Sequence, residues 1–404
     1  MKYIERYRYI QKLVEYRKTC RIVILTGLQG AGKTSLLANT ARELRNEKPP
    51  IRIVQTGHDN GIENRTELLA EAHSLGAGNS ALLIDDADSI EGLAEALSEI
   101  IQNYKTTVFI TGRNTARLES ILEKAFGPTA RGILGTIRVN PFTYTEFLDA
   151  TCLPENYTAL SLYCKTGGLP QSLMVDPQGD DSREFTRLRA NSFLLTEIVE
   201  PRSLRNPGHL REILSIVSHS PGESLSARQI CQAFEAERIT ISPQAVLDYL
   251  EYCATSSLLV PVSVLDIDKK KIIDAGDVWY FGDAGLRAAF VKRETPAELS
   301  RAEENAIFLR LIDDGWTVFH GRVGYGRSLK EEISFVCERN GKRIYLQLIP
   351  NTATSGERLR KRKALLAIRD AWPRYLVDSD SGEDEADGIR RLDTREILIG
   401  GIGG

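Results

Sequence analysis

The sequence predicts an α/β protein, with a parallel sheet covered on both faces and followed by helical and α+β segments. Two observations lead to this prediction. Between residues 19 and 140, short apolar β-branched runs alternate with helical patterns, as crossover connections in a parallel sheet do. The first of these runs leads through a glycine-rich turn into a helix. The length of 404 residues is enough for two or three domains.

The first part, residues 1–140, is expected to hold this sheet behind an N-terminal helix over residues 1–18. The apolar face of that helix is formed by Tyr3, Tyr7, Ile10 and Val14. Strand-like runs are found at residues 21–27, 51–56, 81–86, 107–111 and 134–139. Helical patterns that separate them lie at residues 35–46, 66–74 and 90–104. Together they predict one α/β core built on a parallel sheet.

Three further segments follow this core. Residues 141–204 are mostly helical and are expected to form a lid. Residues 205–285 show three helical patterns and then two strand runs around a polar turn, which is typical of a winged helix. Residues 297–404 are expected to form an α+β domain. Its strand patterns lie at residues 317–319, 332–337, 343–348, 375–377 and 396–399, and its helix patterns at residues 301–313 and 357–371.

Composition excludes several classes of protein. Hydrophobic residues make up 42% and charged residues 26%, which is globular rather than disordered or collagen-like. The net charge of -3 provides no global basic field for nucleic acid. No apolar run reaches the roughly 18 residues of a membrane span, and the N-terminus lacks a signal-peptide core. The six scattered cysteines form no CxxC pair, which argues against zinc and disulfides. We expect a cytoplasmic protein without membrane contact.

The glycine-rich turn is a phosphate-binding motif. GLQGAGKT, residues 27–34, fits GxxxxGK[ST] between a strand and a helix. Its glycines let backbone N–H groups point at phosphate oxygens, and the start of the next helix favours an anion. Lys33 is expected to reach the β- and γ-phosphates of ATP, and the Thr34 hydroxyl to ligate Mg²⁺. The residues expected to bind the nucleotide are Gly27, Gly30, Ala31, Gly32, Lys33, Thr34 and Ser35.

Carboxylates at the end of a second strand complete the expected site. ALLIDD, residues 81–86, is an apolar run ending in Asp85 and Asp86. Asp85 is expected to hold Mg²⁺, directly or through water. Asp86 stands where hydrolysing enzymes of this class usually carry Glu, so it is the candidate base, although it is one methylene shorter. The alternative is that the two aspartates only end a strand.

Thr111 ends another strand-like run, TTVFITGRN. If that strand lies between the strands that end at the P-loop and at Asp85, Thr111 can orient the attacking water or touch the γ-phosphate. The alternative is an ordinary strand end.

The chain resembles the prokaryotic AAA-family ATPases that end in a degenerate restriction-endonuclease-like domain. The resemblance covers nearly the whole chain. It is carried by RYRYIQKLVEYR, the P-loop, LLIDDAD, VFITGRN, NPFTYTEF, GGLPQSL, VWYFGDAGLR and AEENAIFLRL, in that order. It implies an AAA-type core with an inserted strand between the P-loop strand and the Asp-bearing strand.

The resemblance also implies an arginine that contacts the γ-phosphate. The family often carries Gly-Arg before the fifth strand, and Arg131 takes that place here. Arg131 would act within the chain or from a neighbouring subunit, and the latter requires a homo-oligomer. Arg113 and Arg117 are rivals, and each of the three can also be an ordinary surface arginine.

In the C-terminal domain the chain departs from the nuclease pattern that the resemblance implies. A nuclease of that fold needs an Asp on one strand and Glu-x-Lys on the next, where the carboxylates hold a metal. Ser334 stands at the Asp position, and the triplet reads Gln347-Leu348-Ile349. Glu304 and Glu331 could not rebuild the site alone. We expect no nuclease activity.

Evidence for DNA binding is divided. The expected third helix of the winged helix, residues 242–255, has no Lys or Arg and carries Asp248 and Glu251, which opposes phosphate contact. The polar turn Lys269–Lys271 and the run RLRKRK favour it. The basic residues of that run are Arg358, Arg360, Lys361, Arg362 and Lys363. They would contact DNA or an acidic protein partner, or simply form a solvated helix face.

Three functions follow from these observations. The leading one is an Mg²⁺-dependent ATPase whose nucleotide state moves the winged-helix and C-terminal domains. The second is a nucleotide-dependent switch or scaffold that assembles a protein partner with negligible turnover. The third is a DNA-associated ATPase of a mobile-element or phage-defence system. A small P-loop kinase is disfavoured by the appended domains.

Overall fold

A computed structural model of the chain describes residues 2–47, 51–57, 61–76, 79–112, 114–127, 132–179, 181–293, 295–324, 331–378 and 387–402. The chain divides into two compact units, Tyr3–Pro141 and Phe142–Gly404, the latter including residues 1–2. None of the described helices is long and apolar enough to cross a membrane.

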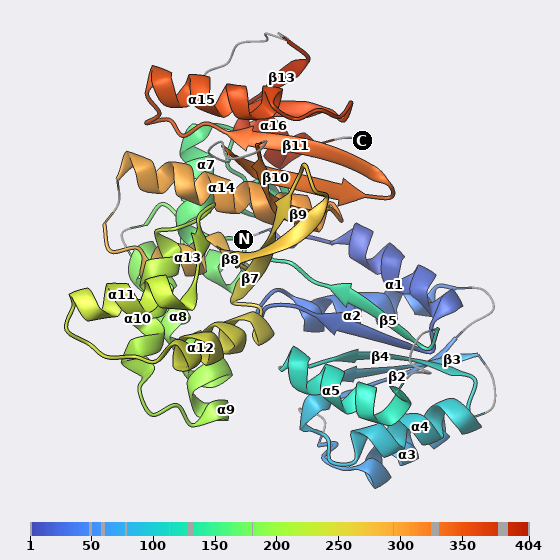
Figure 1. Ribbon diagram of the computed structural model, residues 1–404. Coiled ribbons are helices and arrows are strands. Elements are labelled where there is room, and N and C mark those ends of the chain that lie inside the picture. Colours follow the sequence, from blue (N-terminus) through green and yellow to red (C-terminus); the bar gives the residue numbers. More distant parts are fainter. Residues whose placement is uncertain are drawn as a thin grey trace. The chain divides into compact units, whose positions relative to one another are not determined.

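The first unit is built on a parallel sheet of five strands in the order β2-β3-β4-β1-β5 (Figure 1). Its strands are β1 (Ile22–Thr26), β2 (Arg52–Gly57), β3 (Ser80–Asp85), β4 (Thr106–Thr111) and β5 (Leu134–Arg138). Its helices are α1 (Tyr7–Thr19), α2 (Lys33–Arg45), α3 (Arg65–Ser74), η2 (Ala87–Ser89), α4 (Leu93–Asn103) and α5 (Thr115–Phe126). The predicted insertion of β4 between β1 and β3 is confirmed by both pairings.

The central strands of this sheet are buried on both faces. Every residue of β1 and β4 is buried, as parallel strands covered by helices require. The N-terminal helix differs in part from expectation. It begins at Tyr7 rather than at residue 1, and its buried face is formed by Tyr9, Ile10 and Leu13, while Tyr3 and Tyr7 are exposed.

The second unit contains an eight-stranded mixed sheet in the order β13-β12-β11-β10-β9-β7-β8-β6. Its strands are β6 (Ser224–Leu225), β7 (Leu259–Asp266), β8 (Lys271–Phe281), β9 (Thr317–Val323), β10 (Glu331–Arg339), β11 (Lys342–Leu348), β12 (Arg374–Val377) and β13 (Ile389–Leu392). Strand β7 pairs with β8 in a hairpin and, on its other side, runs parallel to β9. Residues 205–285 and 297–404 therefore share one sheet.

Helices surround this sheet. They are α6 (Tyr144–Thr151), α7 (Tyr157–Thr166), η4 (Pro170–Met174), α8 (Ser182–Phe193), η5 (Leu194–Val199), α9 (Glu200–Arg202), α10 (Pro207–Ser218), α11 (Ala227–Ala236), α12 (Pro243–Thr255), α13 (Ala284–Phe290), α14 (Pro296–Asp313), α15 (Ser355–Leu366) and α16 (Thr394–Gly400). The order α10, α11, α12, β7, β8 is the three helices and hairpin expected from the sequence.

The expected strand at residues 396–399 is wrong, because these residues belong to α16. The Asp393 side chain accepts a hydrogen bond from the backbone N–H of Arg395, and Glu396 reaches back to the N–H of Asp393. This capping box starts a helix where apolar content alone suggested a strand. The preceding β13 was not expected.

The buried carboxylate of Asp283 joins two segments of the second unit that are distant in sequence. Its Oδ2 accepts a hydrogen bond of 2.8 Å from the N–H of Gly168, and its Oδ1 caps α13 through the N–H of Leu286 at 3.0 Å. Asp283 is 1% exposed, and burial raises its pKa above the ordinary value. The backbone N–H groups offset part of the effect of burial, since hydrogen bonds to the carboxylate favour its ionised form.

Two glycines allow this junction to close. A Cβ on Gly167, which has a φ of +78°, would lie 2.2 Å from Asp283 Oδ1. A Cβ on Gly285 would lie 2.2 Å from the carbonyl oxygen of Thr166. Neither position can carry a side chain without moving backbone or a buried carboxylate. The close approach fixes α7 against α13.

Replacement of Gly285 by alanine should therefore destabilise the protein. We expect Gly285→Ala to cost about 1–3 kcal/mol, because the methyl group overlaps backbone atoms. Gly208→Ala is the matched control: Gly208 is also helical, but nothing lies within 4 Å of its Cβ position. That control should be neutral or stabilising by about 0.5–1 kcal/mol. Urea unfolding midpoints measure both, and equal midpoints would contradict the close approach.

Glu303 on α14 makes the stability of the second unit depend on pH. It is 7% exposed. Burial, with a smaller contribution from Asp393, raises the pKa of Glu303 to about 7. The folded state thus binds this proton more tightly than the unfolded chain, where the pKa of Glu is about 4.3. The resulting stabilisation is present below the unfolded pKa and is lost as the pH rises toward 7.

Glu303→Gln should remove this pH dependence. Near pH 4 the variant and the parent should unfold at similar urea concentrations. At pH 8 the variant should be more stable, by on the order of 3 kcal/mol, because it buries no charge. Urea titrations at four pH values between 4 and 8 measure the difference. If the urea midpoints of the two proteins changed in parallel with pH, Glu303 would not be the source of the pH dependence.

Candidate functional site

The loop between β1 and α2 is shaped by glycines in the left-handed region. Gly27, Gly30 and Gly32 have φ values of +117°, +81° and +97°. A Cβ on Gly27 would lie 2.2 Å from the carbonyl oxygen of Val139, so the loop passes directly over the end of β5. Successive N–H groups in such a turn form a concave anion-binding surface. The backbone conformation of this loop therefore requires glycine at these positions.

Lys33 lies across this loop. It is the first residue of α2 and is 8% exposed. Its Nζ donates hydrogen bonds to the carbonyl oxygens of Gly27 at 2.8 Å and Leu28 at 3.2 Å. Thr34 and Ser35, the next residues, are exposed at the start of the helix. The loop thus combines a held ammonium group, open hydroxyls and the positive end of a helix.

Arg6 supports the loop from the N-terminal segment. It is 5% exposed, and its guanidinium donates to the carbonyl oxygens of Ala31 at 3.3 Å and Asn140 at 2.8 Å. It also lies 4.4 Å from the ring centroid of Tyr9. Arg6 therefore ties the P-loop to the chain that follows β5. We did not predict this role, although Arg6 belongs to RYRYIQK, one of the segments that carry the resemblance.

The ends of β3 and β4 are joined by one hydroxyl group. Thr111, which is 1% exposed, donates its hydroxyl proton to Asp85 Oδ1. The hydroxyl oxygen of Thr111 also accepts a hydrogen bond of 3.1 Å from the backbone N–H of Asp86. Asp86 has a φ of +51°, in the left-handed region. Thr111 thus orients the Asp85 carboxylate and fixes the backbone of Asp86.

Parallel strands bring these groups to one edge of the sheet. Strands β1, β4 and β3 are neighbours, and their registers pair Leu25 with Thr111 and Ile84 with Ile110. The P-loop, Thr111 and the Asp85–Asp86 pair all follow the carboxyl ends of these strands. Ligand sites of open parallel sheets form at this edge. The structure therefore brings together the predicted residues Lys33, Thr34, Asp85, Asp86 and Thr111 on that edge.

Within the described residues, none of the three arginines predicted as candidates for γ-phosphate contact is shown to reach this edge. Arg131 and Arg113 lie outside the described residues. Arg117 is exposed on α5, and its backbone N–H binds the capping side chain of Asn114 at 3.0 Å. A carboxylate that we did not predict, Asp88, is 7% exposed and accepts the N–H of Asn114 at 3.1 Å. Asp88 thus anchors the turn after β4.

In the second unit, Ser334 and Gln347, which the resemblance led us to expect at metal-ligand positions of a nuclease, bond each other's strands. The N–H of Ser334 donates to Gln347 Oε1 at 3.1 Å, and the N–H of Leu348 donates to Ser334 Oγ at 3.1 Å. Both side chains are buried and link β10 to β11. Glu304 instead accepts the hydroxyl of Tyr280 at 2.9 Å. Within the described residues, no three His, Cys, Asp or Glu side chains are grouped as metal ligands.

The basic run on α15 is largely neutralised by ion pairs. Arg358 pairs with Asp378, Arg360 lies 3.8 Å from Glu331, and Arg362 lies 2.8 Å from Asp387. Burial lowers the pKa of Lys361, although Glu304 opposes this. Carboxylates of the same unit thus offset much of the positive charge of α15. This weakens the case for DNA binding by this helix.

The first unit matches a known family. Residues 19–148, which include all five strands of the sheet, match the family described as an AAA domain. Residues 157–297 match a domain of unknown function, DUF8612. A protein of Haemophilus influenzae described as uncharacterised is 22% identical over 98% of this chain and 98% of its own length. The Methanocaldococcus jannaschii protein MJ1544 is 21% identical over 74% of this chain and 67% of its own.

Among solved structures, the Walker-type ATPase PABY2304 of Pyrococcus abyssi is similar. It has a TM-score of 0.51 at 16% identity, over 71% of this chain and 96% of that chain. At this identity the similarity shows a shared fold. The family match and the P-loop geometry together support an AAA-type P-loop domain in the first unit.

Proposed function

We propose that this chain, with an AAA-type P-loop domain at residues 19–148, binds ATP and hydrolyses it with Mg²⁺. One observation carries the proposal. The glycine loop with its held Lys33 and the hydrogen-bonded Asp85–Thr111–Asp86 group follow neighbouring parallel strands at one edge of the sheet. Phosphate cradle and carboxylates are the two halves that hydrolysis of a nucleoside triphosphate requires.

The residues present fit a magnesium ion. Thr34 is exposed where α2 begins, and Asp85 is half-buried with its carboxylate oriented by Thr111. Hydroxyl and carboxylate oxygens are the ligands that Mg²⁺ takes beside substrate phosphates. When bound, the ion would neutralise charge that develops on the phosphate oxygens. Thr34 and Asp85 would hold it, Asp85 directly or through water.

Asp86 is proposed as the group that polarises the attacking water. The N–H bond to Thr111 holds its backbone in place, so Thr111 acts as a positioning residue for both aspartates. Because Asp is shorter than Glu, turnover is expected to be slow. The alternative proposal is a nucleotide-dependent switch. Such a switch binds ATP tightly, hydrolyses it negligibly and assembles a protein partner. Arg131 remains our candidate for γ-phosphate contact, within the chain or from a second subunit.

The finer fold assignments are part of this proposal. Three helices and the β7–β8 hairpin support a winged helix over residues 205–285. The order α14, β9, β10, β11, α15, β12 supports a restriction-endonuclease-like fold over residues 297–404. The Ser334–Gln347 bonds support the absence of nuclease activity. Nucleotide state would move these parts, and we propose a cytoplasmic location.

Steady-state ATP turnover and ATP affinity test the proposal. Lys33→Ala should weaken ATP binding and abolish turnover. Asp86→Asn should lower kcat by about a hundredfold and leave ATP binding nearly unchanged, since a base acts in the transition state. Thr111→Val should lower kcat by at least about tenfold, because both aspartates lose their shared partner.

Thr106→Val is the matched control for Thr111→Val. Thr106 is equally buried at the other end of β4, where its hydroxyl bonds Ser80. It should lose stability without a selective loss of kcat. ATP binding without turnover in the parent protein would favour the switch. Absence of ATP binding would refute both readings.

A second function, association with nucleic acid, is favoured by a groove in the second unit. The groove has a volume of about 560 Å³ and is lined by cations from two hairpins, with Trp372 at its side. Lys270 comes from the β7–β8 turn, and Arg339, Lys342 and Arg343 come from β10 and β11. Glu338 offsets one of these charges by pairing with Arg343. Cations beside an exposed aromatic ring suit a single-stranded backbone with a stacked base.

Charge-reversal variants test whether DNA binds at this groove or at α15. Lys270→Glu with Lys342→Glu should weaken binding of a fluorescent DNA single strand by about tenfold or more. It should also reduce the slope of log K against log salt by about 1.4, since each of the two lost contacts contributes about 0.7 on a single strand. Arg360→Glu with Lys363→Glu, the control pair on α15, should change affinity less than about twofold. Equal losses from both pairs, or no binding at low salt, would refute the groove.

A further inference from the structure

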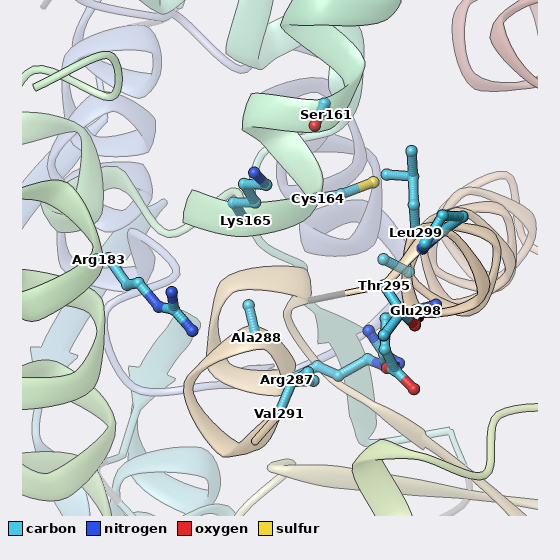
Figure 2. Close-up of a pocket in the computed structure, with 12 residues that line it drawn as sticks. Ser161, Cys164, Lys165, Arg183, Arg287, Ala288, Val291, Thr295, Glu298 and Leu299 are labelled. Carbon is cyan, nitrogen blue, oxygen red and sulfur yellow. Dashed lines mark hydrogen bonds and ion pairs between the residues drawn. The ribbon is translucent and has the colours of Figure 1, made fainter. Parts of the chain in front are cut away.

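Two adjoining cavities lie between helices α7, α8, α13 and α14 of the second unit. Their volumes are about 270 Å³ and about 290 Å³, and Lys165, Arg183 and Ala288 line both of them. Figure 2 shows the side chains of the first cavity arriving from all four helices. All lining residues belong to the second unit, so the cavities are no part of the P-loop site.

The described lining of these cavities is strongly cationic. Its positive side chains are Lys165, Arg183, Arg187 and Arg287. Its one carboxylate, Glu298, is 6% exposed and has both oxygens engaged. Oε2 accepts from Arg287 at 2.7 Å, and Oε1 accepts from Arg301 at 2.7 Å. The cavity therefore favours an anion and offers a cationic ligand no uncommitted carboxylate.

Arg287 is a buried cation in the wall of the first cavity. It is 2% exposed, and its Nε is buried without a hydrogen-bond partner although Nη2 binds Glu298. Burial lowers the pKa of Arg287, and the Glu298 carboxylate counteracts this. The ion pair with Glu298 therefore fixes the Arg287 guanidinium in the wall of the first cavity.

The rest of the first cavity is apolar. Val291, Pro296, Leu299 and Ala302 line it, next to Cys164. Burial raises the pKa of the Cys164 thiol far above its usual range, so this group stays neutral. A neutral thiol among aliphatic side chains is an apolar surface. Most ligand pockets combine such an apolar wall with a few convergent polar groups.

We propose that these cavities bind a small organic anion, with a phosphate or carboxylate group on an apolar body. The anionic group lies where the cavities join, beside Lys165 and Arg183. The apolar body lies against Val291 and Leu299. Guanidinium groups suit both head groups because their N–H donors match two oxygens at once. This site stands whether or not the first unit hydrolyses ATP.

Binding of the fluorescent dye anilinonaphthalene sulfonate to the full chain tests the proposal. The dye carries one anionic group on an aromatic body, and neutral N-phenylnaphthylamine is its uncharged counterpart. We expect one bound dye per chain, with affinity reduced about tenfold or more in Lys165→Gln with Arg183→Gln. The neutral counterpart should lose far less affinity. Saturating ATP with Mg²⁺ should not displace the dye.

Two further variants keep the test decisive. Arg228→Gln with Lys363→Gln removes the same two charge types from exposed positions of the same unit and should leave dye affinity unchanged. Ala288→Leu fills the junction of the two cavities without changing charge and should also block dye binding. It tests the site even if the charge variant is unstable. Urea midpoints check folding.

Displacement of the dye identifies the head group. Phenyl phosphate and phenylacetate compete in separate titrations, and the one that displaces the dye at lower concentration names the preferred anion. Dye binding that survives both Ala288→Leu and the charge variant would overturn the proposal. Displacement by ATP that is lost in Lys33→Ala would also overturn it, because the dye would then lie at the P-loop.

Discussion

Parallel pairing imposes the constraint on which the candidate nucleotide site depends. Parallel strands all end at the same edge of a sheet, so groups that follow neighbouring strands meet there without any further device. Here β4 lies between β1 and β3, and its last residue can bond the carboxylate that ends β3. The glycine loop follows β1 on the other side. Fixing the strand order therefore fixes which side chains can act together.

In the second unit, a buried carboxylate has the corresponding role. Asp283 binds the N–H groups of Gly168 and Leu286, and the two glycines beside it let α7 and α13 approach closely. Those helices also carry Lys165 and Arg287, which line the cationic cavity. The junction thus sets the distance between opposite walls of that cavity.

The P-loop could be predicted because all of its chemistry lies within eight consecutive residues. Asp85 and Thr111 could be predicted because each ends an apolar run. Arg6 could not, since its bond to Asn140 joins residues 134 positions apart. The neutralised arginines of α15 were missed for the same reason, because Asp378 and Asp387 lie in a different segment. Local spacing reveals local sites, whereas charge compensation across a fold has no sequence signature.

The pairing of β7 with β9 makes the solubility of residues 205–285 depend on residues 297–404. Val264, Leu265 and Asp266 align with His320, Gly321 and Arg322. Without residues 297–404, β7 would present unpaired N–H and C=O groups to solvent, an edge that invites aggregation. Residues 297–404 therefore protect β7 by covering this edge, and that role needs no catalytic side chain.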